Sequence, residues 1–385
     1  MASCTTVGVT PVAGPTFSYW RKDGGHLENF RSTSDLPRVQ DIVIIGSGLT
    51  GAACAYYISQ TAGSSSIPTT TVLEAREVCS GATGRNGGHL RPEALASFSK
   101  FSETLGLDSA NEIALFEVAN AEAVKELVQT EGIDCDYTQV ESANVYLDGS
   151  LASAAKSQIG ELARSGYDIV GKIQFHENPH EAEDVTGVLG AKAAATFPAA
   201  SIWPYKLAVH LLKIAMSKGV QLQTHTPAQC ISSTPNDNGY WVISTPRGDM
   251  MAKTVIFATN GYTPNLLPEY AGTIIPVRGI CSHIQAVNTS NPAPVISETI
   301  KTMGIKHSPG CQDYLITRPD GSIVVGGAWK AVRPGPRDDW YNVIDDSQLI
   351  PAAVNYYDGF MQRTFATWEN EPSEVDYLWT GIMGV

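Results

Sequence analysis

The feature that most constrains the fold is the stretch from Asp41 to Glu74, where an apolar run leads through three spaced glycines into a helical pattern. Residues 42–45 form an unbroken apolar run of the kind found in parallel strands that are buried on both faces. Gly46 permits a tight turn, Gly48 lets the backbone approach a pyrophosphate, and Gly51 lets the helix pack closely on the sheet. This stretch predicts a strand–turn–helix unit that binds a dinucleotide.

A second strand with an acidic end completes the fingerprint. Residues 70–73 are predicted as a strand that leads to Glu74, whose carboxylate would accept hydrogen bonds from a ribose hydroxyl. Glu74 follows Gly51 at a spacing close to the ~20 residues of the fingerprint. A purely structural strand–turn–helix is the alternative, but strand, helix and acid together favour a nucleotide site.

A second glycine-rich segment indicates which dinucleotide is bound. Residues 81–89 read GATGRNGGH, a loop whose backbone can wrap a flavin and whose Arg85 guanidinium can meet phosphate. The segment resembles the second FAD-contact stretch of the D-amino-acid oxidase-like (DAO) family of FAD-dependent oxidoreductases, in particular its γ-glutamylputrescine oxidoreductase-like and fungal branch. A nicotinamide-linked dehydrogenase needs no such loop, and a second nucleotide fingerprint is missing from the sequence.

The resemblance runs from about residue 15 to the last residue, and the segments 15–20, 254–264 and 312–327 also carry it. In the family, a segment that begins like 379–384 continues into a helix that contacts the flavin, whereas this sequence ends at Val385, so we expect a shortened C-terminal FAD segment and weakened flavin binding. The resemblance implies FAD as cofactor, held by Gly46, Ser47, Gly48, Leu49, Thr50, Gly51, Glu74, Ala75, Arg76, Gly81, Ala82, Thr83, Arg85, Asn86, Gly87, Gly88, Ala228, Thr259, Asn260, Gly261 and Gly381.

The fold class that we expect is α/β, with a doubly wound, Rossmann-like FAD-binding domain of the glutathione-reductase type and an interleaved α+β substrate domain. The predicted parts are an N-terminal arm (1–35), the FAD-binding domain (36–95 and 200–272), the substrate domain (96–199 and 273–365) and the start of a C-terminal FAD-binding segment (366–385). Further predicted elements are an amphipathic helix over 203–219, a helix over 115–128, short strands around 222, 230–232, 241–244 and 250, a turn at 236–239 and a hairpin over 312–327 that turns at Asp320 and Gly321.

The chemistry that the resemblance implies is oxidation of a carbon–nitrogen bond of a small amine or amino acid, by hydride transfer to flavin N5, with oxygen or an unknown electron acceptor. We predict His89, Arg278 and Tyr314 as the catalytic or pocket residues, with Arg91 close to the flavin loop. Arg278 would pair with a substrate carboxylate or form a structural ion pair. The alternative function is that of a truncated, catalytically weak family member that acts through protein interaction.

Other residues leave two readings open. Trp203 and Trp379 would wall the amine pocket or belong to the core. For His89, a hydrogen-bonding imidazole is favoured over covalent attachment of the flavin, and for Cys311 a free thiol is favoured. Residues 176–180 read HENPH and match the zinc pattern HExxH, but Pro179 lies within the required helical turn, so we predict a solvated loop and no metal site.

Composition favours a cytoplasmic enzyme with small-molecule partners. The net charge of −13 argues against nucleic acid or an anionic membrane surface as partner, and the longest apolar stretch, 42–58, is too short to span a bilayer. The N-terminus lacks the basic and apolar regions of a secretory signal, and seven scattered cysteines suggest no disulfide framework. The sequon at Asn288 is therefore expected to be silent.

Overall fold

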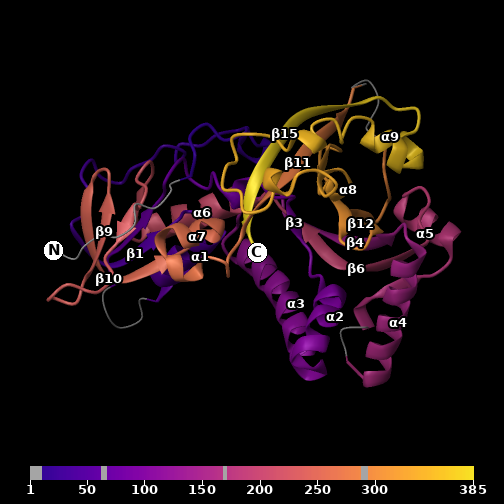
Figure 1. The fold of residues 1–385 in the computed structure, drawn as a ribbon, viewed down its shortest axis with the longest axis horizontal. Coiled ribbons are helices and arrows are strands. Elements are labelled where there is room, and N and C mark those ends of the chain that lie inside the picture. Colours follow the sequence, from indigo (N-terminus) through magenta and orange to yellow (C-terminus); the bar gives the residue numbers. More distant parts are fainter. Residues whose placement is uncertain (1–10, 62–66, 168–170, 288–293) are drawn as a thin grey trace.

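The chain folds around two β-sheets that lie side by side (Figure 1). The structure is a computed structural model and describes residues 11–61, 67–167, 171–287 and 294–385, so the Asn288 sequon lies outside the described residues. Within these ranges, no helix is both long and apolar enough to cross a bilayer.

The first sheet has six strands and is built around β1. In spatial order these are β7 (Gln221–Gln223), β2 (Thr70–Leu73), β1 (Val39–Ile45), β10 (Gly248–Phe257), β9 (Trp241–Thr245) and β8 (Cys230–Ile231). The first four run parallel and the last two continue antiparallel. Helices α1 (Leu49–Gln60) and α6 (Pro204–Ser217) pack on one face, where their apolar residues share a core with Ile44 and Val72. The predicted α/β fold is confirmed, including the strands over 42–45 and 70–73 and the helix within 203–219.

The second sheet has nine strands and is mostly antiparallel. Its spatial order is β15 (Ser373–Gly384), β11 (Pro276–Ala286), β14 (Ile323–Gly326), β13 (Cys311–Thr317), β12 (Ile300–Ser308), β4 (Thr138–Tyr146), β6 (Ala193–Ser201) and β3 (His89–Leu90), with β5 (Gln174–His176) also on β6. The predicted hairpin is confirmed as β13–β14, in which the Gly321 amide donates to the carbonyl of Arg318.

Helices cover both faces of the second sheet (Figure 1). One face meets α5 (Pro179–Thr186), α8 (Trp329–Val332) and α9 (Phe360–Thr364) through an apolar core. The other face carries α2 (Ala94–Leu105), α3 (Leu107–Thr130) and α4 (Gly149–Ser165). It presents the polar residues Asn144 and Thr302, because their neighbours Ala143 and Met303 point into the apolar core of the first face. The remaining short helices are η1 (Tyr19–Arg21), η2 (Ala82–Gly84), η4 (Asn260–Tyr262), α7 (Thr263–Leu266), η5 (Pro268–Tyr270), η6 (Arg337–Asp339), η7 (Pro351–Ala353) and η8 (Ala366–Trp368).

The C-terminal strand differs from the prediction for 366–385. β15 pairs antiparallel with β11 over its whole length and therefore belongs to the second sheet, because main-chain pairing with this long neighbour satisfies its amides and carbonyls. The end of β15 also contacts the segment that follows β10 of the first sheet. There, the Asn260 side chain donates to the Ile382 carbonyl at 2.9 Å and accepts from the Gly384 amide at 3.0 Å. β15 thus connects the second sheet to the first.

The predicted solvated loop at 176–180 is wrong. His176 is buried at the end of β5 and its Nδ1 lies 2.6 Å from the Glu181 carboxylate. Pro179 is the first residue of α5, a position that needs no backbone N–H, and the Asn178 side chain caps the helix by accepting from the His180 amide. The two histidines therefore lie on different elements and do not share one helix face.

Cys311 is a free thiol, as are Cys54, Cys79, Cys135 and Cys281.

Candidate functional site

A cavity of about 440 Å³ opens where the parallel strands of the first sheet end. Ile45, Leu73 and Phe257 are the last residues of β1, β2 and β10, and all three line it, as expected for ligand sites at the carboxyl edge of an α/β sheet. Among the residues predicted to hold FAD, those in its wall are Gly46, Gly48, Leu49, Thr50, Glu74, Ala75, Arg76, Gly81, Ala82, Thr83, Asn86, Ala228, Thr259 and Asn260.

The three glycines are placed as the fingerprint requires. Gly46 has φ +105°, and a methyl group there would lie 2.4 Å from the carbonyl oxygen of Ala258, the residue that follows β10. A methyl group on Gly51 would lie 1.9 Å from the Gly46 carbonyl oxygen, so only glycine lets α1 start this close to the turn. The N-terminus of α1 points at the cavity with Gly48 at its cap position, and no acidic side chain in its first turn cancels the positive end of the helix dipole.

Glu74 is held rigidly at the cavity edge. One carboxylate oxygen accepts from the amide and hydroxyl of Ser47 at 3.1 and 2.6 Å, and the other accepts from the Arg76 amide at 2.9 Å. The side chain is 8% exposed. Ser47 therefore acts beneath the turn by fixing Glu74 and does not itself line the cavity.

The loop over 81–88 runs from this cavity to the second sheet. At its start, the Thr83 hydroxyl accepts from the Leu49 amide at 2.8 Å and so joins the loop to the start of α1. At its end, Gly87 packs against Tyr314 and Gly88 packs against Trp20, away from the first cavity. The remaining two predicted glycines support β15 rather than the cavity: Gly261 packs against Ile382, and Gly381 packs against Arg85.

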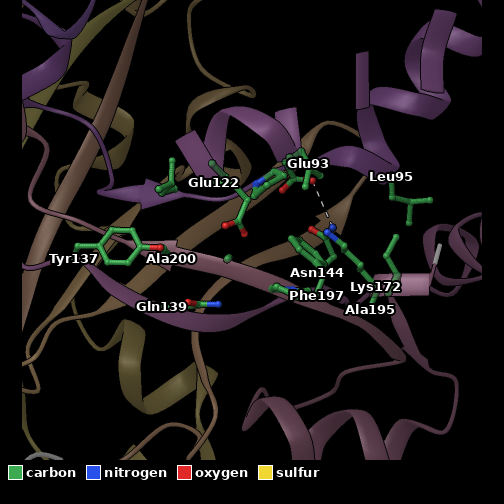
Figure 2. Close-up of a pocket in the computed structure, with 17 residues that line it drawn as sticks. Glu93, Leu95, Glu122, Tyr137, Gln139, Asn144, Lys172, Ala195, Phe197 and Ala200 are labelled. Atoms are coloured by element: carbon green, nitrogen blue, oxygen red, sulfur yellow. Dashed lines mark hydrogen bonds between the residues drawn. The ribbon is translucent and has the colours of Figure 1, made fainter. Parts of the chain in front are cut away.

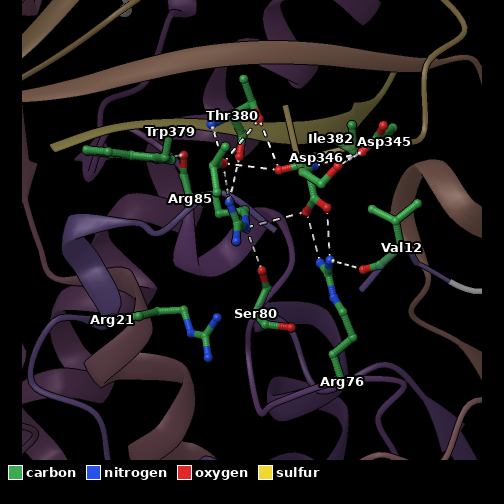
Figure 3. A network of polar contacts seen from close by, with 12 residues as sticks. Val12, Arg21, Arg76, Ser80, Arg85, Asp345, Asp346, Trp379, Thr380 and Ile382 are labelled. Atoms are coloured by element: carbon green, nitrogen blue, oxygen red, sulfur yellow. Dashed lines mark hydrogen bonds and ion pairs between the residues drawn. The ribbon is translucent and has the colours of Figure 1, made fainter. Parts of the chain in front are cut away.

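Arg85 does not meet the cavity, in contrast to its predicted contact with phosphate. Figure 3 shows that its guanidinium turns toward Asp346 and β15, where it donates to the Thr380 carbonyl at 2.7 Å. The Asp346 carboxylate lies between Arg85 and Arg76 and accepts two hydrogen bonds from Arg76, at 2.8 and 2.9 Å. Burial lowers the pKa of Arg85 to about 10, and Asp346 opposes that shift. The guanidinium that we expected to contact phosphate thus pairs with the buried carboxylate of Asp346, which lies far along the chain.

Of the three predicted catalytic residues, the structure brings His89 and Tyr314 together. Their rings meet edge to face with centroids 5.3 Å apart, and His89 Nδ1 lies 2.6 Å from the Thr302 hydroxyl. Burial, reinforced by the charge of Arg91, lowers the pKa of His89 to about 3. Burial also raises the pKa of Tyr314, whose hydroxyl lies 3.2 Å from the Cys281 sulfur.

Arg278 is placed elsewhere and pairs with no carboxylate of the described residues. Its guanidinium donates to the carbonyl of Asp339 at 2.8 Å and to the carbonyl of Asp345 at 3.1 Å, which fixes a loop beside β11. Trp203 and Trp379 are core residues, with indole N–H groups that donate to the carbonyls of Trp20 and Arg85.

A second, smaller cavity of about 80 Å³ lies between α2–α3 and the polar face of the second sheet (Figure 2). This second cavity begins where the loop over 81–88 ends, because Asn86 lines the first cavity and Leu90 lines the second. Its wall is mostly apolar, with Phe197 and Ala195 from β6, and its polar members include Glu93 and Asn144.

Several lining residues of the first cavity were not predicted from the sequence. These are Pro11, Ile45, Leu73, Pro227, Phe257, Ala258, Tyr262, Asn265 and Leu266. The strand ends among them could have been predicted from the sequence, since the last residue of a parallel strand borders the carboxyl edge of the sheet. Pro11 and Tyr262 could not have been predicted, because their positions depend on how segments far apart in the sequence pack together.

The arrangement fits FAD. The glycine turn leaves backbone space that a Cβ would fill, the start of α1 offers amides to phosphate, and a fixed carboxylate stands at the end of β2 for a ribose hydroxyl. Beyond the loop, the buried Nε2 atom of His89 has no hydrogen-bond partner in the described part of the chain.

Comparisons with known proteins agree with this geometry. The chain is 24% identical over 354 residues to γ-glutamylputrescine oxidoreductase of Escherichia coli (strain K12), covering 89% of this chain and 73% of that protein. It is 23% identical over 314 residues to glycine oxidase of Bacillus subtilis (strain 168), covering 80% and 73%.

Solved structures show the same fold at lower identity. A glycine oxidase from Geobacillus kaustophilus superposes with a TM-score of 0.65 at 20% identity, over 90% of this chain and 83% of that one. An L-amino acid deaminase from Proteus vulgaris gives 0.66 at 16% identity, over 94% and 82%. The family model described as FAD dependent oxidoreductase (DAO) matches residues 41–385, and the chain therefore belongs to this family of FAD-binding oxidoreductases.

Proposed function

We propose that this FAD-dependent oxidoreductase oxidises a carbon–nitrogen bond of a small amine or amino acid. The observation that carries the proposal is that the chain runs directly from the wall of the dinucleotide cavity, at Asn86, to the wall of a mostly apolar cavity on the polar face of the second sheet, at Leu90. The names of the relatives, γ-glutamylputrescine oxidoreductase and glycine oxidase, support an amine or amino acid as substrate. When bound, FAD would accept a hydride at N5 from the substrate carbon next to nitrogen.

The protein would supply binding, orientation and exclusion of water. Glu74, the glycine turn and the start of α1 would hold the ADP part of the cofactor. Neutral His89 places no positive charge beside an amine, and its Nε2 is free to form a hydrogen bond at the end of the flavin loop. The apolar wall of the smaller cavity favours the unprotonated amine, which is the form that can lose hydride.

The compartment and partners are part of the same proposal. We propose a cytoplasmic enzyme that uses oxygen or another electron acceptor and works without nucleic acid or membrane partners. The net charge of −13 supports the last point, because it repels polyanions and anionic lipid surfaces.

The test is anaerobic reduction of the FAD-loaded full chain by a panel of amines and amino acids, followed by the visible flavin bands. Bleaching by a member of the panel supports the proposal. A protein that binds FAD and is bleached by dithionite but by none of the panel would contradict it, and one that cannot bind FAD would favour the interaction role.

Glu74 provides a sharper test of the cofactor site. Glu74→Gln weakens the acceptor for a ribose hydroxyl and its support from Ser47, so the Kd for FAD is expected to rise about ten-fold. FAD fluorescence quenching measures this, with Glu269→Gln on the exposed η5 turn as a matched control that leaves the Kd unchanged. Equal affinities in Glu74→Gln and the unaltered chain would remove Glu74 from the site.

A further inference from the structure

The smaller cavity contains a feature that bears on which substrates the site accepts. Arg91 lies directly behind its wall and contacts three lining residues: Glu93, Asn144 and Phe197. Figure 2 shows Glu93 and Asn144 side by side, joined by the 3.4 Å hydrogen bond from the amide of Asn144 to the Glu93 carboxylate. An arginine in this position is the natural partner for the carboxylate of an amino acid.

The sheet is built to receive this guanidinium. Gly304 on β12 lies beneath it, and a methyl group there would come within 3.4 Å of both terminal nitrogens. Phe197 stacks on the guanidinium, with its ring centroid 5.0 Å from the Arg91 Cζ atom. The guanidinium is therefore fixed in place and is 93% buried.

Every edge of the guanidinium is already engaged by the protein. Nε donates to the Ser142 hydroxyl, and Nη2 donates to the Ala143 carbonyl at 3.0 Å and to the Asn144 side chain at 2.9 Å. Nη1 forms an ion pair with the Glu93 carboxylate. Glu93 thus stands where the carboxylate of a bound amino acid would otherwise pair.

The other charged groups around the cavity do not replace Arg91. Lys306 lies behind the wall, 4.0 Å from the same Glu93 carboxylate, and burial together with Arg91 lowers its pKa to about 8. Lys172 lines the cavity but is exposed, so solvent weakens its attraction for an anion. Glu122 also lines the cavity, but its carboxylate is exposed, so solvent weakens its repulsion of an anion. Arg278, the other predicted carboxylate partner, is bound to backbone carbonyls.

We propose that Glu93 is a specificity-determining residue, which occupies Arg91 and restricts the site to small apolar amines that lack an α-carboxylate. This inference rests on the proposed function, since it names the substrate class of the same site. Among the residues that the structure describes, no unpaired cation lies on the buried wall, so a carboxylate that entered the cavity would face Glu93, and an unpaired buried charge is strongly disfavoured. A neutral amine with an aliphatic chain brings no negative charge to Glu93, and its chain packs on the apolar residues of the lining.

The experiment compares 3-methylbutylamine with leucine, which differ only by the carboxylate. With the FAD-loaded full chain, the second-order rate constant for flavin reduction is expected to be roughly ten-fold or more higher for the amine. Glu93→Gln frees Arg91 and is expected to narrow this ratio roughly ten-fold. Glu122→Gln removes one negative charge from the same cavity without freeing Arg91, and it is expected to keep the ratio.

A binding measurement separates this inference from the proposed function. The unreactive anion 4-methylpentanoate is expected to bind the FAD-loaded Glu93→Gln protein in calorimetry and not the unaltered chain or Glu122→Gln. If leucine reduces the flavin as fast as the amine, or if the two variants shift the ratio equally, the role of Glu93 is wrong while the oxidoreductase function stands. If neither compound reduces the flavin, the proposed function fails, and the binding of 4-methylpentanoate still decides the role of Glu93.

Discussion

At the scale of single residues, two positions show how backbone space and burial set the properties of the site. Gly51 lies where α1 touches the glycine turn, with no room for a methyl group against the Gly46 carbonyl. His89 lies where the flavin loop enters the second sheet, with one ring nitrogen bonded to Thr302 and the other buried. Neither property is visible in residue type alone.

Gly51→Ala is expected to push α1 away from the turn. The new Cβ would lie 1.9 Å from a backbone oxygen, so the free energy of unfolding should fall by about 1–3 kcal/mol and the affinity for FAD should drop. Gly160→Ala in α4 is the matched control, because a Cβ there meets nothing within 4 Å and alanine favours a helix by roughly 0.5–1 kcal/mol. Urea unfolding and FAD titration of both variants measure these effects. Equal unfolding free energies and equal FAD affinities in the two variants would contradict the role of Gly51.

His89 is expected to make the protein sensitive to acid. Its pKa is lowered from 6.5 to about 3, so between these values the unfolded chain holds a proton that the folded chain lacks. The free energy of unfolding should therefore fall as the pH drops through this window, by about 1.4 kcal/mol per pH unit from this residue.

Urea unfolding at several pH values measures the slope. His89→Gln cannot titrate and should flatten it, whereas His180→Gln, at an exposed position on α5, should not. A slope that survives in His89→Gln would assign the acid sensitivity to other groups.

At the scale of elements, the loop over 81–88 is fastened to α1 by one hydrogen bond. The Thr83 hydroxyl accepts from the Leu49 amide, one of the first amides of the helix, so it acts as a cap supplied from another segment. Both residues line the larger cavity. The position of the loop and the start of the helix are therefore set together.

Thr83→Val keeps the shape of the side chain but removes the acceptor. We expect a loss of about 1 kcal/mol in the free energy of unfolding and weaker FAD binding, measured by urea unfolding and fluorescence titration. Thr83→Ser retains the hydroxyl and should behave like the unaltered chain. If valine and serine have the same effect, the hydrogen bond does not couple the two elements.

Elements with strong local patterns were predicted well, and those set by tertiary pairing were not. The apolar run before Gly46 and the periodic helix within 203–219 are found as β1 and α6. Residues 176–180 became a strand end and a capped helix, because Pro179 suits the first helical position as well as a loop. Residues 373–384 belong to the second sheet because they pair with β11. Their own sequence does not indicate this partner.

At the scale of the whole molecule, Asp346 connects four distant segments. It pairs with Arg76 beside the cavity and with Arg85 in the flavin loop, and its backbone carbonyl accepts from Thr16 in the N-terminal segment and from Thr380 in β15 (Figure 3). The side chain is 1% exposed. This buried network explains why Arg85 does not line the larger cavity: loop composition gives the backbone path, but the partner of a long side chain lies far along the chain.

Asp346→Asn is expected to leave two buried guanidinium groups without their carboxylate. Breaking a buried ion pair in this way costs about 3–5 kcal/mol, so urea unfolding should show a large loss and FAD affinity should fall as Arg76 moves. Asp345→Asn is the adjacent control, because the donor to that carboxylate among the described residues is Ser347, nearby in the chain. Similar losses in both variants would show that Asp346 has no special role in joining the segments.

The pairing of β1 with β10 sets the order in which the chain can acquire its structure. β1 ends at Ile45, but one of its two neighbours is complete only at Phe257, after β3, β4, β5 and β6 of the second sheet have been made. During synthesis on the ribosome, the edge of β1 must therefore wait unpaired while about two hundred residues emerge, a period in which open strand edges invite aggregation. Closing such a long loop is slow, so a nascent chain of this kind benefits from chaperones that shield the edge until its partner arrives.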